Sequence, residues 1–148
     1  MKYSFFLLLI LFMHSTNAQD LSKHQWNDRI LLVLSEDFEN SKIPLEFFNQ
    51  IKELKENRDG FKDRKVVIYN VLPTEYQFIN TINRKETDWI QSDSLFISFN
   101  QEKAPFKVIL IGLDSTIKAT QTDFFSSKEL FAIIDGMPMR KAEMKSRN

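Results

Sequence analysis

Three carboxylates follow the first long apolar run that comes after the N-terminal segment of this chain. Glu36, Asp37 and Glu39 lie in a mostly polar loop behind residues 29–34. Carboxylate oxygens are the ligands that hard cations such as Ca²⁺ and Mg²⁺ prefer, although the calcium-loop pattern of spaced ligands is absent. Glu39 would also be favourable simply as a negative charge near the start of the next helix. The loop therefore supports a metal-dependent or other enzyme only as the alternative interpretation, and we assign no metal and no cofactor.

Nucleophilic chemistry has little support in the sequence. The 148 residues contain no cysteine, which excludes thiol–disulfide exchange, disulfides and thiolate metal sites. Beyond residue 18 the chain has one histidine, His24. A serine nucleophile needs a base that is itself oriented by an acid, and no acid or nucleophile is expected beside His24. We interpret His24 as a surface or packing residue and assign no catalytic residue.

Two arginines are candidates for one shared role. Arg29 borders an apolar strand and Arg140 follows the last long helix. In the structural interpretation, which we favour, Arg29 caps backbone carbonyls or pairs with an acid such as Asp135. In the functional interpretation, one guanidinium receives a carboxylate of a ligand or partner peptide. Arg140 can also pair with Glu143 three residues later, which on a surface contributes only tenths of a kcal/mol.

Three methionines near the end of the chain offer soft sulfur ligands. Met137, Met139 and Met144 could suit Cu(I), but no cysteine and no nearby histidine supports them. If this tail is helical, Met137 and Met144 share a side and Met139 points away. We favour the interpretation that they fill gaps where the last helix meets the sheet.

Four segments are predicted to be strands. Residues 29–34, 65–71 and 106–111 are nearly continuous apolar runs, as in strands that are covered on both faces. Residues 116–120 alternate between polar and apolar, like an outer strand that returns after the turn at Asp114 and Ser115. The first two strands, separated by a helix, are expected to be parallel in one sheet.

The helices are predicted from their start and stop signals. Pro44 suits the first turn of a helix that buries Phe47, Phe48, Ile51 and Leu54, with Gln50 on another face, and that fades near residues 57–60. Thr74 predicts a helix through Asn83. Ser92 or Asp93 predicts a short one through Phe99, although this stretch would also suit a strand.

The C-terminal part carries the clearest helix signals. Ser126 and Glu129 have capping-box spacing, and Phe125 with Leu130 occupy the positions of a hydrophobic staple. Gly136 predicts the end of this helix. Pro138 then starts a short helical tail within residues 137–148.

Composition and the N-terminus indicate an exported single domain. Lys2 precedes an apolar run at residues 5–13 that is too short to span a bilayer, and Thr16-Asn17-Ala18 suits signal cleavage after Ala18. We expect a signal peptide at residues 1–18 and one domain at residues 19–148, periplasmic or secreted, without stable membrane insertion. Lys+Arg and Asp+Glu both number 20, so no net charge recruits nucleic acid.

The order β-α-β-α-β-β-α, with a proline just before the third strand, resembles the thioredoxin fold. The resemblance implies an α/β domain with a central mixed four-stranded sheet flanked by helices. It matches Pro105 to the proline, commonly cis, that faces the active site. It places the two redox cysteine positions, counted back from Pro44, on Glu36 and Glu39, so the redox cysteines are absent.

A narrower resemblance covers most of residues 19–148. Residues 106–114 and 129–144, including Met137-Pro138-Met139-Arg140, and residues 26–29 before the first strand, look like a family of exported bacterial proteins of unknown function. A related domain occurs in animal matrix proteins of the sushi-repeat and DUDES type. The resemblance implies a non-catalytic, exported thioredoxin-like domain that binds a protein or peptide partner. Its candidate ligand or partner surface comprises Glu36, Glu39, Pro105, Arg29 and Arg140, with a groove near Pro105 that could accept an extended backbone.

Overall fold

The protein is built on one mixed β-sheet. The computed structural model describes residues 19–36 and 44–147. In this described part, seven strands form a sheet in the order β4-β3-β2-β1-β6-β7, with β5 also paired to β3. The strands are β1 (Arg29–Ser35), β2 (Val66–Val71), β3 (Glu75–Asn80), β4 (Lys85–Glu86), β5 (Ile90–Gln91), β6 (Phe106–Ile111) and β7 (Ile117–Gln121). Strand β1 runs parallel to β2 and antiparallel to β6, and β6 runs antiparallel to β7.

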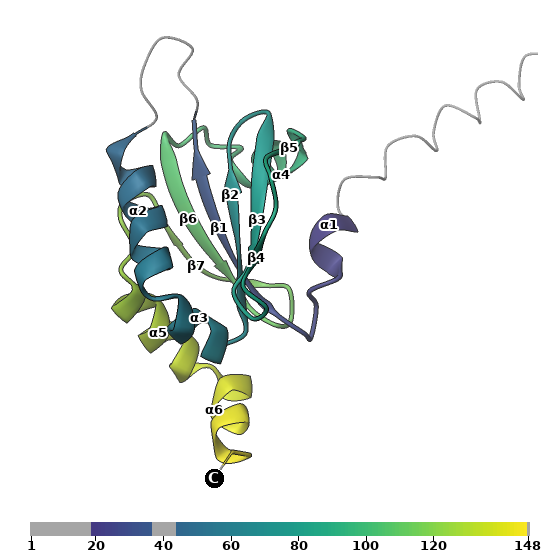
Figure 1. Cartoon of the computed structure of the whole chain (residues 1–148), viewed down its shortest axis with the longest axis vertical. Coiled ribbons are helices and arrows are strands. Elements are labelled where there is room, and N and C mark those ends of the chain that lie inside the picture. Colours follow the sequence, from purple (N-terminus) through teal and green to yellow (C-terminus); the bar gives the residue numbers. More distant parts are fainter. Residues whose placement is uncertain (1–18, 37–43, 148) are drawn as a thin grey trace, which may run out of the picture.

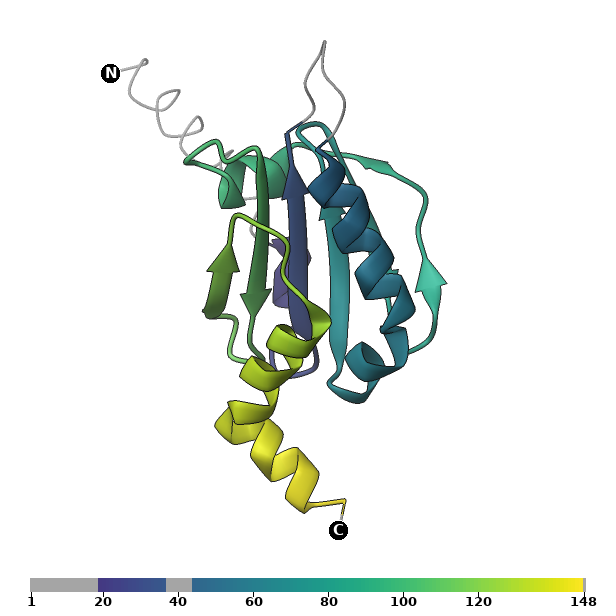
Figure 2. The same ribbon diagram turned by 90° about the vertical axis from the view of Figure 1, so that its left-hand side faces the viewer.

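Helices cover both faces of this sheet (Figures 1 and 2). Helices α2 (Leu45–Glu56), α3 (Arg58–Asp63) and α5 (Ser127–Gly136) lie on one face. Helices α1 (Gln19–Ser22) and α4 (Ser94–Phe99) pack on the other face, and α6 (Pro138–Lys145) continues beyond the end of the sheet at which β1 begins. No helix of the described residues has the length and apolar character needed to cross a bilayer.

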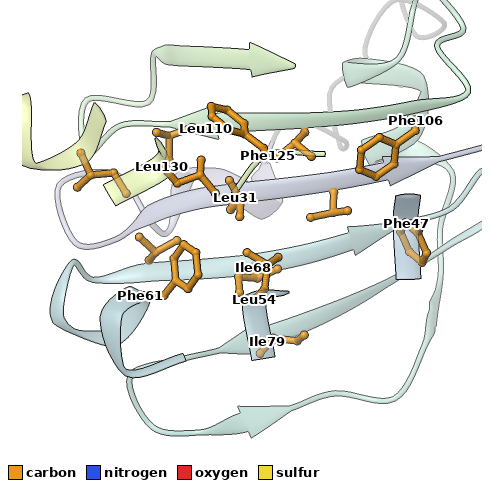
Figure 3. Packing of buried hydrophobic residues seen from close by; sticks show 14 of the residues in the cluster. Leu31, Phe47, Leu54, Phe61, Ile68, Ile79, Phe106, Leu110, Phe125 and Leu130 are labelled. Atoms are coloured by element: carbon orange, nitrogen blue, oxygen red, sulfur yellow. The ribbon is translucent and has the colours of Figure 1, made fainter. Parts of the chain in front are cut away.

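The central strands supply two hydrophobic cores at once. Along β1, Leu31 and Val33 point into the core under α2, α3 and α5, whereas Leu32 and its alternate neighbours point into the core under α1 and α4. Figure 3 shows Leu31 and Ile68 of the sheet packed with Leu54 and Phe61 of the helices. Full burial of one such side chain contributes about 1.5–3 kcal/mol. Burial on both faces explains why these strands are continuous apolar runs in the sequence.

The four predicted strands and the expected fold class are confirmed. The segments 29–34, 65–71, 106–111 and 116–120 correspond to β1, β2, β6 and β7, which are neighbours in one sheet. The chain order and the strand directions make a thioredoxin-like mixed sheet flanked by helices, without cysteine. The described sheet extends beyond these four strands, because β3, β4 and β5 continue it on the far side of β2.

The predicted helix from Thr74 to Asn83 is wrong. Residues 75–80 form β3, which pairs antiparallel with β2. Tyr76 and Phe78 pack in one core and Ile79 in the other, so the apolar pattern has the period of a strand. Pairing with β2 prevails over the helix-capping potential of Thr74.

Gln50 was assigned to the wrong face of α2. Its side chain is buried, and its Nε2 donates to the Phe125 carbonyl while its Oε1 accepts from the Phe125 N–H, each at 2.8 Å. These two bonds satisfy a loop backbone at the point where it enters the core. Phe48, which the periodicity assigned to the buried face, is exposed.

The capping box, the stop at Gly136, the start at Pro138 and the short helix after Asp93 are confirmed. The capping box of Ser126 and Glu129 is present, α5 ends at Gly136, and Pro138 is the first residue of α6. The short helix after Asp93 is α4. Helix α2 ends at Glu56, but a further helix, α3, begins at Arg58 and contains Gly60.

Candidate functional site

Arg29 begins β1 and is fully buried. Its Nη1 donates to the Arg64 carbonyl at 2.8 Å, and its two Nη atoms contact the Glu143 carboxylate at 3.4 and 3.3 Å. Its Nε has no hydrogen-bond partner among the described residues. The expected carbonyl capping is therefore present, and the acid that pairs with Arg29 is Glu143 rather than Asp135.

Arg140 lies in the first turn of the last helix, α6, and joins the same cluster. Its Nε donates to Asp135 at 3.2 Å, and its Nη1 donates to the Asp63 carbonyl at 2.9 Å and to Glu143 at 3.4 Å. Its Nη2 donates to the Asp63 carboxylate. The predicted Arg140–Glu143 pair exists, but it is not a surface pair, because Arg140 is buried. Arg29 and Arg140 thus meet through Glu143, as the idea of a shared role required.

The carboxylates of this cluster are held in their charged form. Burial alone would raise the pKa of Asp135, but hydrogen bonds from Arg64 and Arg140 outweigh it and lower the pKa below its ordinary value. A hydrogen bond from Arg147 is the largest cause that lowers the pKa of Asp63; partial burial opposes it, and the hydrogen bond from Arg140 adds to the lowering. The same acids raise the pKa of Arg140 although its burial acts in the opposite direction. The cluster is an ion network that ties α6 to the end of the sheet.

A cavity opens beside this network. Its volume is about 300 Å³, and its apolar wall is formed by Leu113, Met137, Pro138 and Met139. Arg29, Asp114 and Lys118 contribute its polar lining. Lys118 donates to Asp114 at 2.8 Å, and this bond, together with those from Thr116, lowers the pKa of Asp114 to about 2. Asp114 is therefore charged at neutral pH and offsets the charge of Lys118, as Glu143 offsets that of Arg29.

Glu36 and Pro105 meet at the opposite end of β1. The Glu36 N–H donates to the Pro105 carbonyl at 3.0 Å, so the loop after β1 does lie beside the residue before β6. Pro105 follows a trans peptide bond, since none of the described bonds is cis. Asp37 and Glu39 lie outside the described residues, and a metal site that uses them stays a prediction.

The residue before Pro105 is already paired within the chain. Asn100 is buried, its Nδ2 donates to the Ala104 carbonyl at 3.0 Å, and its Oδ1 accepts from the Ala104 N–H at 3.0 Å. Both main-chain groups of Ala104 are therefore occupied. An extended partner at Pro105, as the predicted groove required, would have to displace Asn100.

The five candidate residues do not form one surface. Arg29 and Arg140 lie at the beginning of β1, whereas Glu36 and Pro105 lie at its end, which is roughly 20 Å away along a strand of this length. Glu39 lies outside the described residues. Figure 1 shows the two ends, with α6 at the end where β1 begins.

His24 has partners that the sequence interpretation missed. Its Nδ1 lies 2.8 Å from an Asp28 carboxylate oxygen, and its Nε2 lies 2.9 Å from the Tyr69 hydroxyl. The expectation that no acid lies beside His24 was wrong, and the four-residue spacing from His24 to Asp28 was the available signal. His24 and Tyr69 are both buried, so these bonds fasten the segment before β1 to the sheet.

Two further site residues were misjudged. Met139 was expected to point away from Met137, yet both line the cavity beside Arg29. Arg64 was not singled out, although it joins Asp135 to the network through bonds of 3.0 and 2.6 Å. Among the described residues, no group of three or more histidine, aspartate or glutamate side chains is placed to hold a metal ion.

Comparisons with known proteins give a family and a weak structural likeness. A thioredoxin-fold protein from Helicobacter pylori is 18% identical, with 78% of this chain and 72% of that chain covered and a TM-score of 0.45. A search of curated proteins gave no match. The assignment of the fold rests on the strand order and directions described above. The family described as "Domain of unknown function (DUF4174)" matches residues 20–143, and the chain therefore belongs to this family.

Proposed function

We propose that this chain is a non-catalytic, exported binding domain that recognises a partner protein or peptide as an extended segment along β7. The proposal includes the periplasmic or secreted location, which rests on the signal-like residues 1–18. It also includes the kinship with exported bacterial relatives that end in Met-Pro-Met-Arg and with the domain of animal matrix proteins.

The chemistry of the thioredoxin-type site argues for binding rather than catalysis. The chain has no cysteine, so no thiolate can attack a disulfide. At the position of the thioredoxin redox site, the Glu36 N–H donates to the Pro105 carbonyl, and the Asn100 amide is hydrogen-bonded to both main-chain groups of Ala104. The thioredoxin-like backbone is therefore present at this place, but it has no cysteine for redox chemistry, and the main-chain groups of Ala104 are already hydrogen-bonded and do not pair with a partner.

The observation that carries the proposal is the open edge of the sheet at β7. Within the described part of the chain, β7 pairs only with β6 (Figure 2). At the opposite edge, the short strands β4 and β5 cover β3. An uncovered edge offers main-chain donors and acceptors to a further strand, and side chains beside it give specificity. Ile117, which is 55% exposed, and Phe124, just after the strand, are apolar contacts of this kind.

Site-specific photo-crosslinking in the exported fraction tests the proposal. A photoreactive residue replaces Thr120, which is exposed in β7, and in a matched protein it replaces Lys128, which is exposed on α5. We expect a discrete adduct from position 120 that is absent from position 128. Equal adducts from both positions, or none from position 120, would overturn recognition along β7.

Export is tested separately. The protein is expressed from its full sequence, purified from the exported fraction and sequenced from its N-terminus. We expect a chain that begins at Gln19. A product that retains residues 1–18 and stays inside the cell would contradict the exported location without affecting the crosslinking result.

A further inference from the structure

The end of the sheet at which β1 begins carries lysines without acidic partners. Four exposed lysines lie there on two neighbouring segments, the turn between α3 and β2 and the helix α6: Lys62, Lys65, Lys141 and Lys145. The contacts of Arg140 and Arg147 with Asp63 hold α6 against this turn, so the two pairs of lysines lie near one another. None of the four forms an ion pair within the described chain, whereas the acids of the ion network are already paired with arginines.

Charge is thus unevenly distributed, although the whole chain is neutral. Lys+Arg and Asp+Glu both number 20. Toward the other end of β1, the exposed acids Glu46, in the first turn of α2, and Asp123, just after β7, have no cationic partner among the described residues. An anionic surface would therefore attract the end with α6 and repel the opposite one, which orients the molecule before contact (Figure 1).

Trp26 adds a large apolar group to the lysine-bearing end. Its side chain is 62% exposed, and its N–H donates to the Leu113 carbonyl at 2.7 Å. Leu113 lines one cavity with Met139, whose side chain is also exposed. The backbone of Trp26 has a φ of 64°, a conformation that is unusual for a bulky residue and that glycine adopts at lower cost. An exposed side chain in this conformation stabilises the fold little, and such strain is typical of functional sites.

The combination of tryptophan and lysine indicates the class of the partner. Tryptophan is frequent in the centre of protein interfaces, but lysine is depleted there. At a bilayer surface, tryptophan prefers the level of the headgroups, and each lysine near an anionic leaflet strengthens attachment about fivefold. Exposed lysines beside an exposed tryptophan therefore fit an anionic lipid surface better than a protein surface.

We propose that the basic end of the molecule, which comprises Trp26 and the four lysines, adheres to an anionic lipid bilayer. Trp26 lies at the level of the headgroups, and the lysines lie beside the lipid phosphates. The attachment is peripheral and inserts no helix. The inference goes beyond the proposed function and uses no residue of β7, so the two proposals stand or fall independently.

Vesicle binding tests the inference. The protein is purified from the exported fraction and mixed with vesicles of equal parts phosphatidylcholine and phosphatidylglycerol, and with vesicles of phosphatidylcholine alone as the comparison. We expect binding to the anionic vesicles to be at least about tenfold tighter and to weaken as the salt concentration rises. Equal binding to the two kinds of vesicle, or none to the anionic ones, would overturn the inference.

Paired lysine variants separate a local effect from a change in net charge. Lys141→Glu combined with Lys145→Glu reverses two charges at the basic end and is expected to weaken binding to the anionic vesicles at least about tenfold. Lys103→Glu combined with Lys128→Glu makes the same change in net charge at exposed positions outside the basic end, and is expected to change binding less than about threefold. Equal losses in the two proteins would contradict the inference.

Trp26 provides a readout at the contact itself. The chain has two tryptophans, so Trp26 is the sole one in the variant Trp89→Phe. When anionic vesicles are added to this variant, we expect its fluorescence to shift to shorter wavelength and to be quenched by brominated lipid. Fluorescence that stays unchanged on binding would overturn the inference.

Glycine at position 26 distinguishes a binding role from a structural one. Trp26→Gly relieves the left-handed backbone, so we expect the thermal midpoint to be kept or raised while vesicle binding weakens at least about fivefold. Trp89→Gly is the matched control and is expected to leave vesicle binding unchanged. Vesicle binding by Trp26→Gly that equals that of the natural protein would refute the inference.

Other anionic partners would give a different pattern of results. Binding of polyglutamate or single-stranded DNA, without binding to the anionic vesicles, would assign the basic end to an acidic polymer and overturn the lipid assignment. An adduct from position 120 without vesicle binding would refute only this inference and leave recognition along β7 standing.

Discussion

The two ends of β1 are organised in opposite ways. Where β1 begins, buried arginines and carboxylates from α3, α5 and α6 form an ion network beside a cavity. Where β1 ends, the Glu36 N–H is bonded to the Pro105 carbonyl, and the amide of Asn100 is bonded to the main chain of Ala104. Among the described residues, the Glu36 N–H and both main-chain groups of Ala104 are thus hydrogen-bonded at the end that a thioredoxin would use for chemistry, whereas Arg29 Nε at the other end is a buried donor without a partner. A shared scaffold does not fix where a ligand binds.

The largest expected effect comes from the ion network. Arg140→Met removes a buried cation and leaves Asp63 and Asp135 without one of their donors. We expect a loss of about 3–5 kcal/mol in the free energy of unfolding, as for other broken buried pairs. Urea denaturation at pH 7 measures it. Arg147→Met is the control: Arg147 is exposed and also contacts Asp63, and a loss below about 1 kcal/mol is expected there. Similar losses in both variants would mean that burial does not distinguish the two contacts.

Acid should remove part of the same stabilisation. The pKa values of Asp63 and Asp135 are lowered by folding from an ordinary value of 3.8, so their contribution is complete above that pH and is lost as the pH falls below it. We expect the free energy of unfolding to fall more steeply below about pH 4 in the natural protein than in Arg140→Met. Equal slopes for the two proteins would show that these carboxylates do not depend on Arg140.

A substitution of Asn100 tests how much the hydrogen bonds beside Pro105, at the end of β1, contribute to stability. Asn100→Ala leaves the partly buried main-chain groups of Ala104 without partners, and we expect a loss of about 1–3 kcal/mol in the free energy of unfolding. Asn27→Ala removes the long hydrogen bonds of an exposed side chain and is expected to change stability by less than about 0.5 kcal/mol. Chemical denaturation of the two variants measures the difference. A loss as large as that of Arg140→Met would contradict the ranking of the two ends.

The smallest expected effect concerns the turn before β7. Ser115 has a φ of 64°, a conformation that glycine adopts at lower cost. Ser115→Gly is therefore expected to raise the free energy of unfolding by up to about 1 kcal/mol. Ser98→Gly, in α4, is expected to lower it by about 0.5 kcal/mol, because glycine disfavours a helix. A thermal unfolding comparison distinguishes them, and destabilisation by both would argue against relief of strain at Ser115.

Local signals in the sequence predicted much of the fold. The strands β1, β2 and β6 can be predicted from the sequence because both of their faces are buried, which makes each one a continuous apolar run. The capping box can also be predicted, because Ser126 and Glu129 are only three residues apart. The segment 75–80 was misassigned because a helix cap is a local signal, whereas its pairing with β2 is not. Gln50 was placed on the wrong face because its partner, Phe125, is distant in the sequence.

The candidate site was less predictable than the fold. Arg29 and Arg140 were singled out together, and the structure joins them through Glu143. Glu36 and Pro105 were correctly placed side by side, but the role of Asn100 at Ala104 was not foreseen. The bond from His24 to Asp28 spans four residues and could have been predicted from the sequence. The bond from His24 to Tyr69 joins residues that are distant in the sequence, so it could not.

The sequence by itself determined that no thiol chemistry is possible, and it determined which runs become the central strands, because composition and hydrophobic period need no partner. Tertiary structure alone decided that Arg29, Met139 and Lys118 share one cavity, that the Asn100 amide bonds the main chain of Ala104, and that β7 pairs only with β6 within the described residues. These features depend on which distant segments meet. A linear pattern does not contain that information, because the free energy of each contact depends on residues elsewhere in the chain.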